Sequence, residues 1–195
     1  MAKLYFRYGP MNCGKSTTLM QVAHNYEENH QKVVVIKSSI DTKANDQLES
    51  RIGIRRKVDI LLSPEDSLEK YYDEWNENVS CVLVDEAQFL KPKQIEELWI
   101  ASKMLDIPVI CYGLKTNFLS EMFEGSKRLI ELADTLEELV TICSCGKKAK
   151  FNARFVNDIF QTEGESVVID GEQENTEYRP LCGKCYLKRK MERNG

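Results

Sequence analysis

Short apolar runs, rich in valine and isoleucine, recur along the chain and predict buried β-strands. They span 33–37 (VVVIK), 81–89 (CVLVDEAQF) and 107–113 (IPVICYG). Continuous runs of this kind are typical of strands that are covered on both faces, as in parallel sheets. Residues 3–8 (KLYFRY) instead alternate polar with apolar side chains before Gly9-Pro10, which predicts a strand that ends at a tight loop.

Segments of helical composition separate these runs. We expect helices at 15–30, 64–78, 92–106 and 125–136. The alternation of strands and helices predicts an α/β fold with a mainly parallel sheet and crossover helices. Because such sheets bind ligands beyond the carboxyl ends of their strands, residues at those ends are candidates for a functional site.

Two segments depart from this alternation. Residues 41–57 are polar and contain three arginines, which predicts a surface loop or an extended arm. From about residue 139 onward, paired cysteines, short strand-like stretches and turn residues precede a basic tail at 186–195. We therefore expect a main domain at 1–138 and a small second domain at 139–195.

Composition and charge agree with a small globular protein. The chain has 195 residues, of which 42% are hydrophobic and 30% are charged, enough for one α/β core and an appendage. A formal net charge of -4 gives no general attraction to nucleic acid, so a local site must hold any polyphosphate. The N-terminal residues do not resemble an export signal, and no apolar run approaches the ~20 residues of a membrane span. We expect a cytoplasmic protein with neither nucleic acid nor membrane as partner.

The strongest motif is GPMNCGKS at Gly9–Ser16, which matches the phosphate-binding pattern G-x-x-x-x-G-K-[ST] between a predicted strand and a predicted helix. Backbone N–H groups and the helix N-terminus can bind phosphate oxygens there, while Lys15 can reach the terminal phosphates. A chance glycine turn before a helix is the alternative. The residues expected to bind ATP and magnesium are Gly9, Pro10, Met11, Asn12, Cys13, Gly14, Lys15, Ser16, Thr17 and Asp85.

Two carboxylates, Asp85 and Glu86, end the apolar run that begins at Cys81. P-loop enzymes use an acidic residue at this point to approach magnesium, so we assign that role to Asp85, acting through a water molecule. Neighbouring strand residues point to opposite sides, but the chain can turn at a strand's end, which leaves Glu86 for the role of general base. The alternative is that both residues only solvate the end of a strand.

Four of the seven cysteines form two close pairs, Cys143 with Cys145 and Cys182 with Cys185. In a reducing compartment, clustered thiols favour metal ligation over disulfides. Two such pairs can complete a tetrahedral structural zinc site. Four unrelated thiols and a redox switch are the alternatives.

In their order along nearly the whole chain, these motifs resemble the thymidine kinases of the type shared by animal cytosol and many bacteria. That family has a G-P-M-x-x-G-K-[ST] loop, a D-E-x-Q-F strand end, a G-L-x-x-x-F lid segment and a zinc module with a nucleoside-binding loop. The corresponding segments here are 9–16, 85–89, 113–118 and the stretch that leads to 178–182.

The resemblance implies transfer of the γ-phosphoryl group of ATP to the 5′-hydroxyl of thymidine, with magnesium as cofactor, a structural zinc and a homotetrameric assembly. It implies that Glu86 is the catalytic base. The residues implied to bind thymidine are Met11, Gln88, Phe89, Leu114, Phe118, Phe123 and Tyr178. It also implies that the loop ending at Tyr178, which includes residues 169–175, binds the edge of the thymine base through its backbone groups. Ordinary core packing is the alternative for Phe118, Phe123 and Tyr178.

Two other classes of protein share parts of this pattern. One is a nucleic-acid-dependent P-loop ATPase whose cysteine module grips the polymer, and the acidic balance and short length speak against it. The other is a nucleotide-binding regulator without turnover, which an intact Glu86 disfavours.

Overall fold

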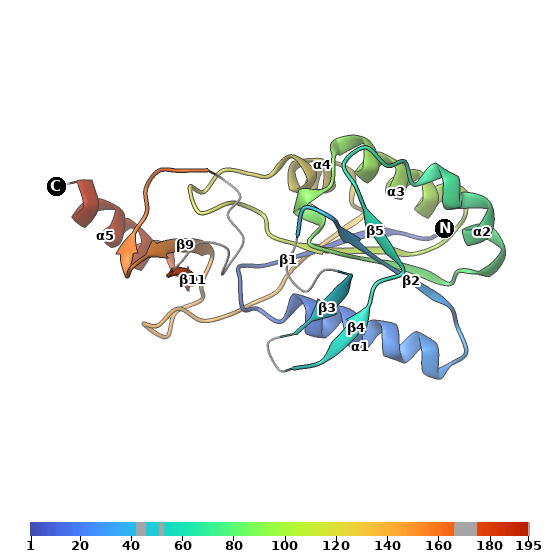
Figure 1. Cartoon of the computed structure of the whole chain (residues 1–195), viewed down its shortest axis with the longest axis horizontal. Helices are drawn as coiled ribbons and strands as arrows, with labels where there is room; N and C mark the ends of the chain where they lie inside the picture. The colour runs from blue at the N-terminus through green and yellow to red at the C-terminus, as the bar shows by residue number, and fades with distance from the viewer. Residues whose placement is uncertain (42–45, 51–52, 166–174, 195) are drawn as a thin grey trace.

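The structure is a computed structural model that describes residues 1–41, 46–50, 53–165 and 175–194. The molecule is elongated, with a large α/β part and a small part that carries the C-terminus at the far end (Figure 1). The strands of the large part are β1 (Leu4–Tyr8), β2 (Val33–Ser38), β3 (Gln47–Glu49), β4 (Arg55–Lys57), β5 (Ile60–Leu62), β6 (Cys81–Asp85), β7 (Val109–Gly113) and β8 (Thr135–Glu138). Its α-helices are α1 (Lys15–Glu28), α2 (Tyr72–Asn78), α3 (Pro92–Met104) and α4 (Glu124–Leu132).

Six of these strands form one sheet in the order β5-β2-β6-β7-β1-β8, and every pairing within it is parallel. The strand order reverses between β6 and β1, as in other α/β folds whose ligands bind at the carboxyl edge of the sheet. The predicted α/β fold with a mainly parallel sheet is confirmed.

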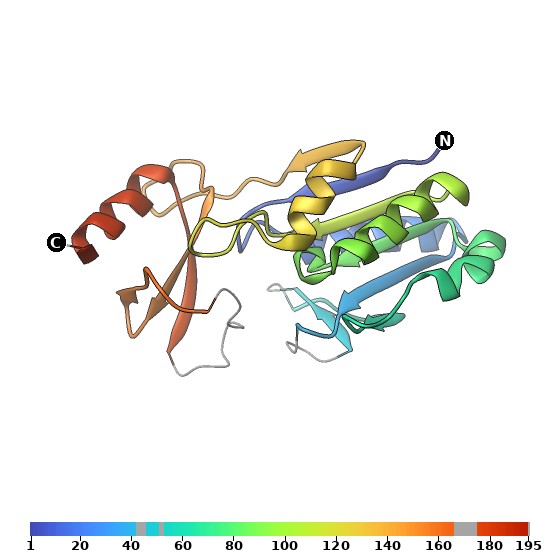
Figure 2. The ribbon, with the colours of Figure 1, turned by 90° about the horizontal axis from the view of Figure 1, so that it is seen from above.

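Side-chain alternation along the central strands divides the core into two layers. On β6, Val82 and Val84 pack on one face with Leu98 of α3, whereas Leu83 packs on the other face with Leu19 of α1. Helices α2, α3 and α4 therefore cover one face, and α1 covers the opposite face together with the β3–β4 hairpin (Figures 1 and 2). Burial on both faces explains the continuous apolar runs of these strands.

The helix expected to continue to residue 136 ends earlier, at Leu132. Ala133 has extended backbone angles, and Asp134 exchanges hydrogen bonds with Leu4: its carboxylate accepts from the Leu4 N–H at 2.7 Å and its N–H donates to the Leu4 carbonyl at 2.9 Å. These bonds start the parallel pairing of β8 with β1. Pairing with a distant strand thus overrides the helical composition of this segment.

Two other expectations need correction, and one strand was not predicted. The strand expected at 81–89 ends at Asp85, and residues Ala87–Phe89 form a 3₁₀ turn. The helix expected from residue 64 begins only with a 3₁₀ turn at Glu69–Tyr71 followed by α2. The short edge strand β5 was not predicted.

The described residues of the segment at 41–57 form an arm rather than a solvated loop. Strands β3 and β4 pair antiparallel in it, and Leu48 is buried in the core layer of α1. Residues 42–45 and 51–52 lie outside the described ranges. The arm contributes to the pocket described below.

The described residues of the small part form a three-stranded antiparallel sheet in the order β10-β9-β11 and one helix. Its elements are β9 (Phe151–Val156), β10 (Ile159–Phe160), β11 (Thr176–Leu181) and α5 (Gly183–Asn194). Phe155, Phe160 and Tyr186 form its core with neighbouring cysteines. The division of the chain at 138/139 stays a prediction. No helix in the described part of the chain combines the length and the apolar character that a membrane span requires.

Candidate active site

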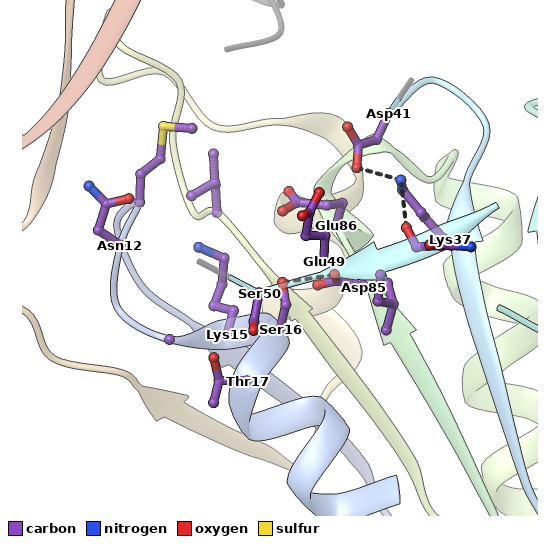
Figure 3. A pocket seen from close by; sticks show the side chains of 15 residues that line it. Asn12, Lys15, Ser16, Thr17, Lys37, Asp41, Glu49, Ser50, Asp85 and Glu86 are labelled. Carbon is purple, nitrogen blue, oxygen red and sulfur yellow. Dashed lines mark hydrogen bonds and ion pairs between the residues drawn. The ribbon is translucent and has the colours of Figure 1, made fainter. Parts of the chain in front are cut away.

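The phosphate-binding motif forms the turn between β1 and α1, at the carboxyl edge of the sheet (Figure 3). Gly14 caps α1 with a left-handed backbone (φ 81°), a conformation that glycine adopts without steric cost. No side chain among the described residues caps this helix, so its first N–H groups are available to an anion. The loop therefore has the form of an anion cradle.

Lys15 lies at the first position of α1 and is only 7% exposed. Its ammonium group donates to the Pro10 carbonyl at 3.2 Å, across the loop. Lys15 also lines the pocket in front of the loop (Figure 3). A phosphate group in that pocket would compete with one backbone carbonyl for this charge.

Asp85 lies at the end of β6, where it is 3% exposed and accepts a hydrogen bond from the Ser16 hydroxyl at 3.0 Å. Its second carboxylate oxygen, Oδ1, is buried and has no hydrogen-bond partner in the described structure. Burial, reinforced by the charge of Glu86, raises the pKa of Asp85. A buried carboxylate with an unsatisfied oxygen beside a serine hydroxyl suits a hard cation such as magnesium, which would supply the missing partner.

Glu86 follows with a left-handed backbone (φ 49°), which is uncommon for a residue with a side chain. This turn brings both carboxylates to the same pocket, although adjacent strand residues normally point apart. The half-buried Glu86 carboxylate accepts a hydrogen bond from the amide of Gln88. Strain of this kind at a polar residue is typical of functional sites.

Gln88 links Glu86 to the next strand. It is 2% exposed, and its Oε1 accepts the Leu114 N–H at 3.0 Å while its Nε2 donates to Glu86. Gly113 makes room for it, since a Cβ there would lie 2.7 Å from Gln88 Oε1. Both ends of the amide are thus occupied by the protein, and Gln88 holds Glu86 against the end of β7.

One pocket of about 260 Å³ joins these groups. The described residues that line it are Met11, Asn12, Gly14, Lys15, Ser16, Thr17, Lys37, Asp41, Gln47, Leu48, Glu49, Ser50, Asp85, Glu86 and Leu114. Two lysines face four carboxylic acids in this set, so an incoming polyphosphate would need a divalent cation to balance the charge.

Sequence reasoning missed the side of this pocket that β2 and the arm supply. Lys37 is buried at the end of β2, where it forms an ion pair with Asp41 at 3.1 Å and donates to the Gln47 carbonyl at 3.3 Å (Figure 3). Its position directly after the apolar run at 33–36 was the available signal, because ligands gather at the carboxyl ends of parallel strands. The arm residues carry no comparable local motif.

The residues predicted to surround thymidine fall into two groups. Met11 and Leu114 line the pocket beside Glu86, whereas Gln88 and the four aromatic residues are not among its described lining. Phe89 and Phe123 contact each other edge to face, with their ring centres 5.7 Å apart. Phe118 is buried beneath the guanidinium group of Arg154, 3.7 Å from its ring centre, and Tyr178 lies on β11. Of the predicted base-reading loop at 169–175, only Asn175 lies within the described residues.

The four paired cysteines converge in the small part. Their sulfur atoms all lie within 4.8 Å of one another, and Cys145 Sγ is 3.6 Å from Cys182 Sγ. A tetrahedral zinc with Zn–S bonds of about 2.3 Å has sulfur–sulfur edges of about 3.8 Å, close to this separation. Although burial opposes it, hydrogen bonds from backbone groups of Cys145 and Cys182 lower the pKa of Cys143 to about 6. The cluster is therefore compatible with zinc, including the pair that has a single intervening residue.

A parallel sheet, a glycine-bounded loop before α1 and an acidic strand end beside it define a P-loop nucleotide-binding protein. The family model "Thymidine kinase" matches residues 2–186, nearly the full chain. The protein belongs to the thymidine kinase family, whose members use ATP.

Curated relatives agree over almost their full length. A thymidine kinase of Haemophilus influenzae is 46% identical over 190 residues, covering 93% of this chain and 94% of the relative. A thymidine kinase of Lactococcus lactis subsp. lactis is 43% identical, covering 96% of this chain and 98% of the relative. A thymidine kinase of Francisella tularensis subsp. tularensis is 41% identical, covering 94% of this chain and 96% of the relative. Among solved structures, a Pif1 helicase from Candida albicans aligns with a TM-score of 0.42 and 13% identity, over 71% of this chain and 36% of that one.

Proposed function

We propose that the protein transfers the γ-phosphoryl group of ATP to the 5′-hydroxyl of thymidine, giving thymidine monophosphate and ADP. The observation that carries this proposal is the single pocket shared by the phosphate loop, the Asp85–Glu86 pair and the apolar residues Met11 and Leu114. A nucleoside kinase needs four parts in one place: a phosphate-binding loop, a metal-binding carboxylate, a general base and an apolar wall. Family membership supports the same activity.

Glu86 is the proposed general base. As the 5′-oxygen bonds to the γ-phosphorus, the bond from that phosphorus to the β–γ bridging oxygen breaks, and the hydroxyl proton passes to the Glu86 carboxylate. The link from Gln88 to Leu114 fixes this carboxylate at the end of β7. Lys15 and backbone N–H groups of the loop Gly9–Gly14 would bind the phosphates, except the N–H of Met11, which donates to Asn152, and Thr17 completes the start of α1.

Ser16 and Asp85 are the proposed contacts to magnesium, with Asp85 acting directly or through water. The unpartnered Oδ1 of Asp85 and the excess of carboxylic acids around the pocket support this assignment. When bound, magnesium would neutralise charge on the β- and γ-phosphates. The raised pKa of Asp85 would fall in the presence of the cation, because a nearby positive charge favours the carboxylate.

The thymidine site is proposed to use Met11 and Leu114 as walls, with Gln88 behind them. Backbone groups in the loop before Tyr178 would read the thymine edge. Most of that loop lies outside the described residues. The remaining residues proposed for this site are the aromatic ones, Phe89, Phe118, Phe123 and Tyr178.

Cys143, Cys145, Cys182 and Cys185 are proposed to bind one structural zinc. The metal would stabilise a small part whose core is otherwise limited to a few aromatic and aliphatic side chains. With four sulfur ligands its coordination shell is complete, which favours a structural over a catalytic role.

The deciding experiment measures transfer from labelled ATP to thymidine, deoxycytidine and purine nucleosides in parallel, and ATP hydrolysis with and without DNA. Thymidine monophosphate as the main product supports the proposal. DNA-stimulated hydrolysis without a phosphorylated nucleoside would favour a nucleic-acid-dependent ATPase, and ATP binding without turnover would favour a regulator. A homotetramer and a cytoplasmic location are further proposals, which light scattering and cell fractionation test.

A further inference from the structure

Asn152, on β9 of the small part, is hydrogen-bonded to two segments of the large part at once. Its Oδ1 accepts the backbone N–H of Met11, in the phosphate loop, at 2.7 Å. Its Nδ2 donates to the carbonyl of Thr116, in the lid segment 113–118, at 3.2 Å. The two partners are an N–H and a carbonyl, so they settle which end of the amide faces which segment. Asn152 is 4% exposed, and its side chain is committed to this junction.

Two other side-chain contacts between described residues of the two parts reach the lid segment. The Tyr186 hydroxyl donates to the Phe118 carbonyl at 2.6 Å, and Arg154 stacks on the Phe118 ring. These interactions hold the lid segment against β9 and α5. The hydrogen bond to Met11 is different because it ends on the loop that begins the nucleotide site.

The Met11 N–H occupies a sensitive position in that loop. It follows Gly9-Pro10, and Asn12 immediately after it has a left-handed backbone (φ 66°). The hydrogen bond to Asn152 orients this N–H toward β9. It thereby fixes the backbone at Met11, and the later N–H groups of the loop follow from that position. A pre-arranged loop binds phosphate more tightly, because less conformational entropy is lost on binding.

We propose that Asn152 is a positioning residue that sets the phosphate loop from the small part and couples that loop to the lid segment. The role deepens the proposed kinase function, on which its effect on thymidine rests. Its effect on ATP follows from the loop alone. Loss of the hydrogen bond to the loop should weaken ATP binding about tenfold, the upper end of what one bond of this kind contributes. The KM for thymidine should rise by a similar factor through the lid, while kcat at saturation changes less than about threefold.

Two variants separate hydrogen bonding from packing. Asn152→Ala removes the amide and leaves a cavity, whereas Asn152→Leu removes it and nearly keeps the volume. Tyr186→Phe is the matched control, since it deletes a hydrogen bond from the small part to the lid without touching the phosphate loop. The dissociation constant of ATP is measured by titration calorimetry without nucleoside, and metal content and melting temperature show that each full-length variant is folded.

Both Asn152 variants should weaken ATP binding about tenfold with metal content unchanged, and Tyr186→Phe should raise only the KM for thymidine. Wild-type ATP affinity in either folded Asn152 variant, or an equal loss in Tyr186→Phe, would overturn the proposal. An effect confined to Asn152→Ala would also overturn it, because a cavity would then be the cause. If the wild-type protein binds ATP but does not phosphorylate thymidine, the proposed function fails while the ATP test of Asn152 still decides this inference.

Discussion

Replacing Glu86 with glutamine changes the chemistry of the site with little change in shape. The introduced amide has nearly the same size as the carboxylate, and its oxygen can still accept the hydrogen bond from Gln88. The link from Gln88 to the Leu114 N–H is therefore expected to persist. What disappears is the negative charge and the ability to accept a proton from the 5′-hydroxyl.

The expected loss in kcat is about two to four orders of magnitude, the usual worth of a positioned general base. It corresponds to about 2.7 to 5.4 kcal/mol of transition-state stabilisation at about 1.36 kcal/mol per factor of ten. ATP affinity should be retained or slightly increased. The charge of Glu86 raises the pKa of Asp85, so its removal favours the ionised form of Asp85 that would attract magnesium.

The assay compares kcat with labelled ATP and saturating thymidine, together with the dissociation constant of ATP from direct titration. Glu49→Gln is the matched control. It removes the same charge from the same pocket, but Glu49 forms its ion pair with Arg55. We expect the control to lose less than about tenfold in kcat.

A loss below about tenfold in Glu86→Gln would refute its role as base. Equal losses in Glu86→Gln and Glu49→Gln would point to the overall charge of the pocket instead. Parallel loss of ATP binding in Glu86→Gln would mean that the substitution disturbs the phosphate loop, and the kcat ratio would then carry no information on proton transfer.

Three further predictions concern the phosphate loop, the structural zinc and the nucleobase of the substrate. Lys15→Ala should abolish phosphoryl transfer in a folded protein, because it removes the cation on a cradle built of backbone groups; near-normal turnover, measured by product formation, would contradict the P-loop assignment. The protein should contain about one zinc per chain by metal analysis, and chelation or Cys182→Ser should unfold the small part before the α/β part; metal-free protein with unchanged melting and full activity would exclude a structural zinc. Thymidine or deoxyuridine should be preferred to deoxycytidine and purine nucleosides in parallel transfer assays. A loop matched to the N3–H and carbonyl groups of thymine would leave buried polar groups unpaired when cytosine is bound. A preference for deoxycytidine would keep the kinase chemistry and overturn the assignment of thymine as the preferred nucleobase.

The parts of the site that contiguous residues encode could be predicted from the sequence. The loop at 9–16 is a local motif between a strand and a helix, and the structure has α1 beginning at Lys15, where the predicted helix begins. The apolar run that ends in Asp85 and Glu86 likewise predicted a strand with two carboxylates at its end. In both cases neighbours in sequence are sufficient, because backbone geometry over a few residues determines where the groups point.

Elements that depend on pairing with a distant segment were not predictable in this way. Residues 135–138 have the composition of a helix, yet they form β8 because β1 offers an open edge of the sheet. The sequence at 41–57 contains no apolar run, and among its described residues Leu48 packs in the core layer of α1.

The sequence by itself determined the phosphate loop, the acidic strand end, the cysteine pairs and the alternation that produces a parallel sheet, because each is a short-range pattern with a fixed period or spacing. Only the tertiary structure decided which side chains complete the pocket and how the two parts meet. Asn152 lies 141 residues from Met11 in the chain, and no local rule connects an asparagine in a short strand with a glycine-rich loop that far away. Their contact exists because the small part packs at the carboxyl edge of the sheet, where the strand order places the loop and the lid segment side by side.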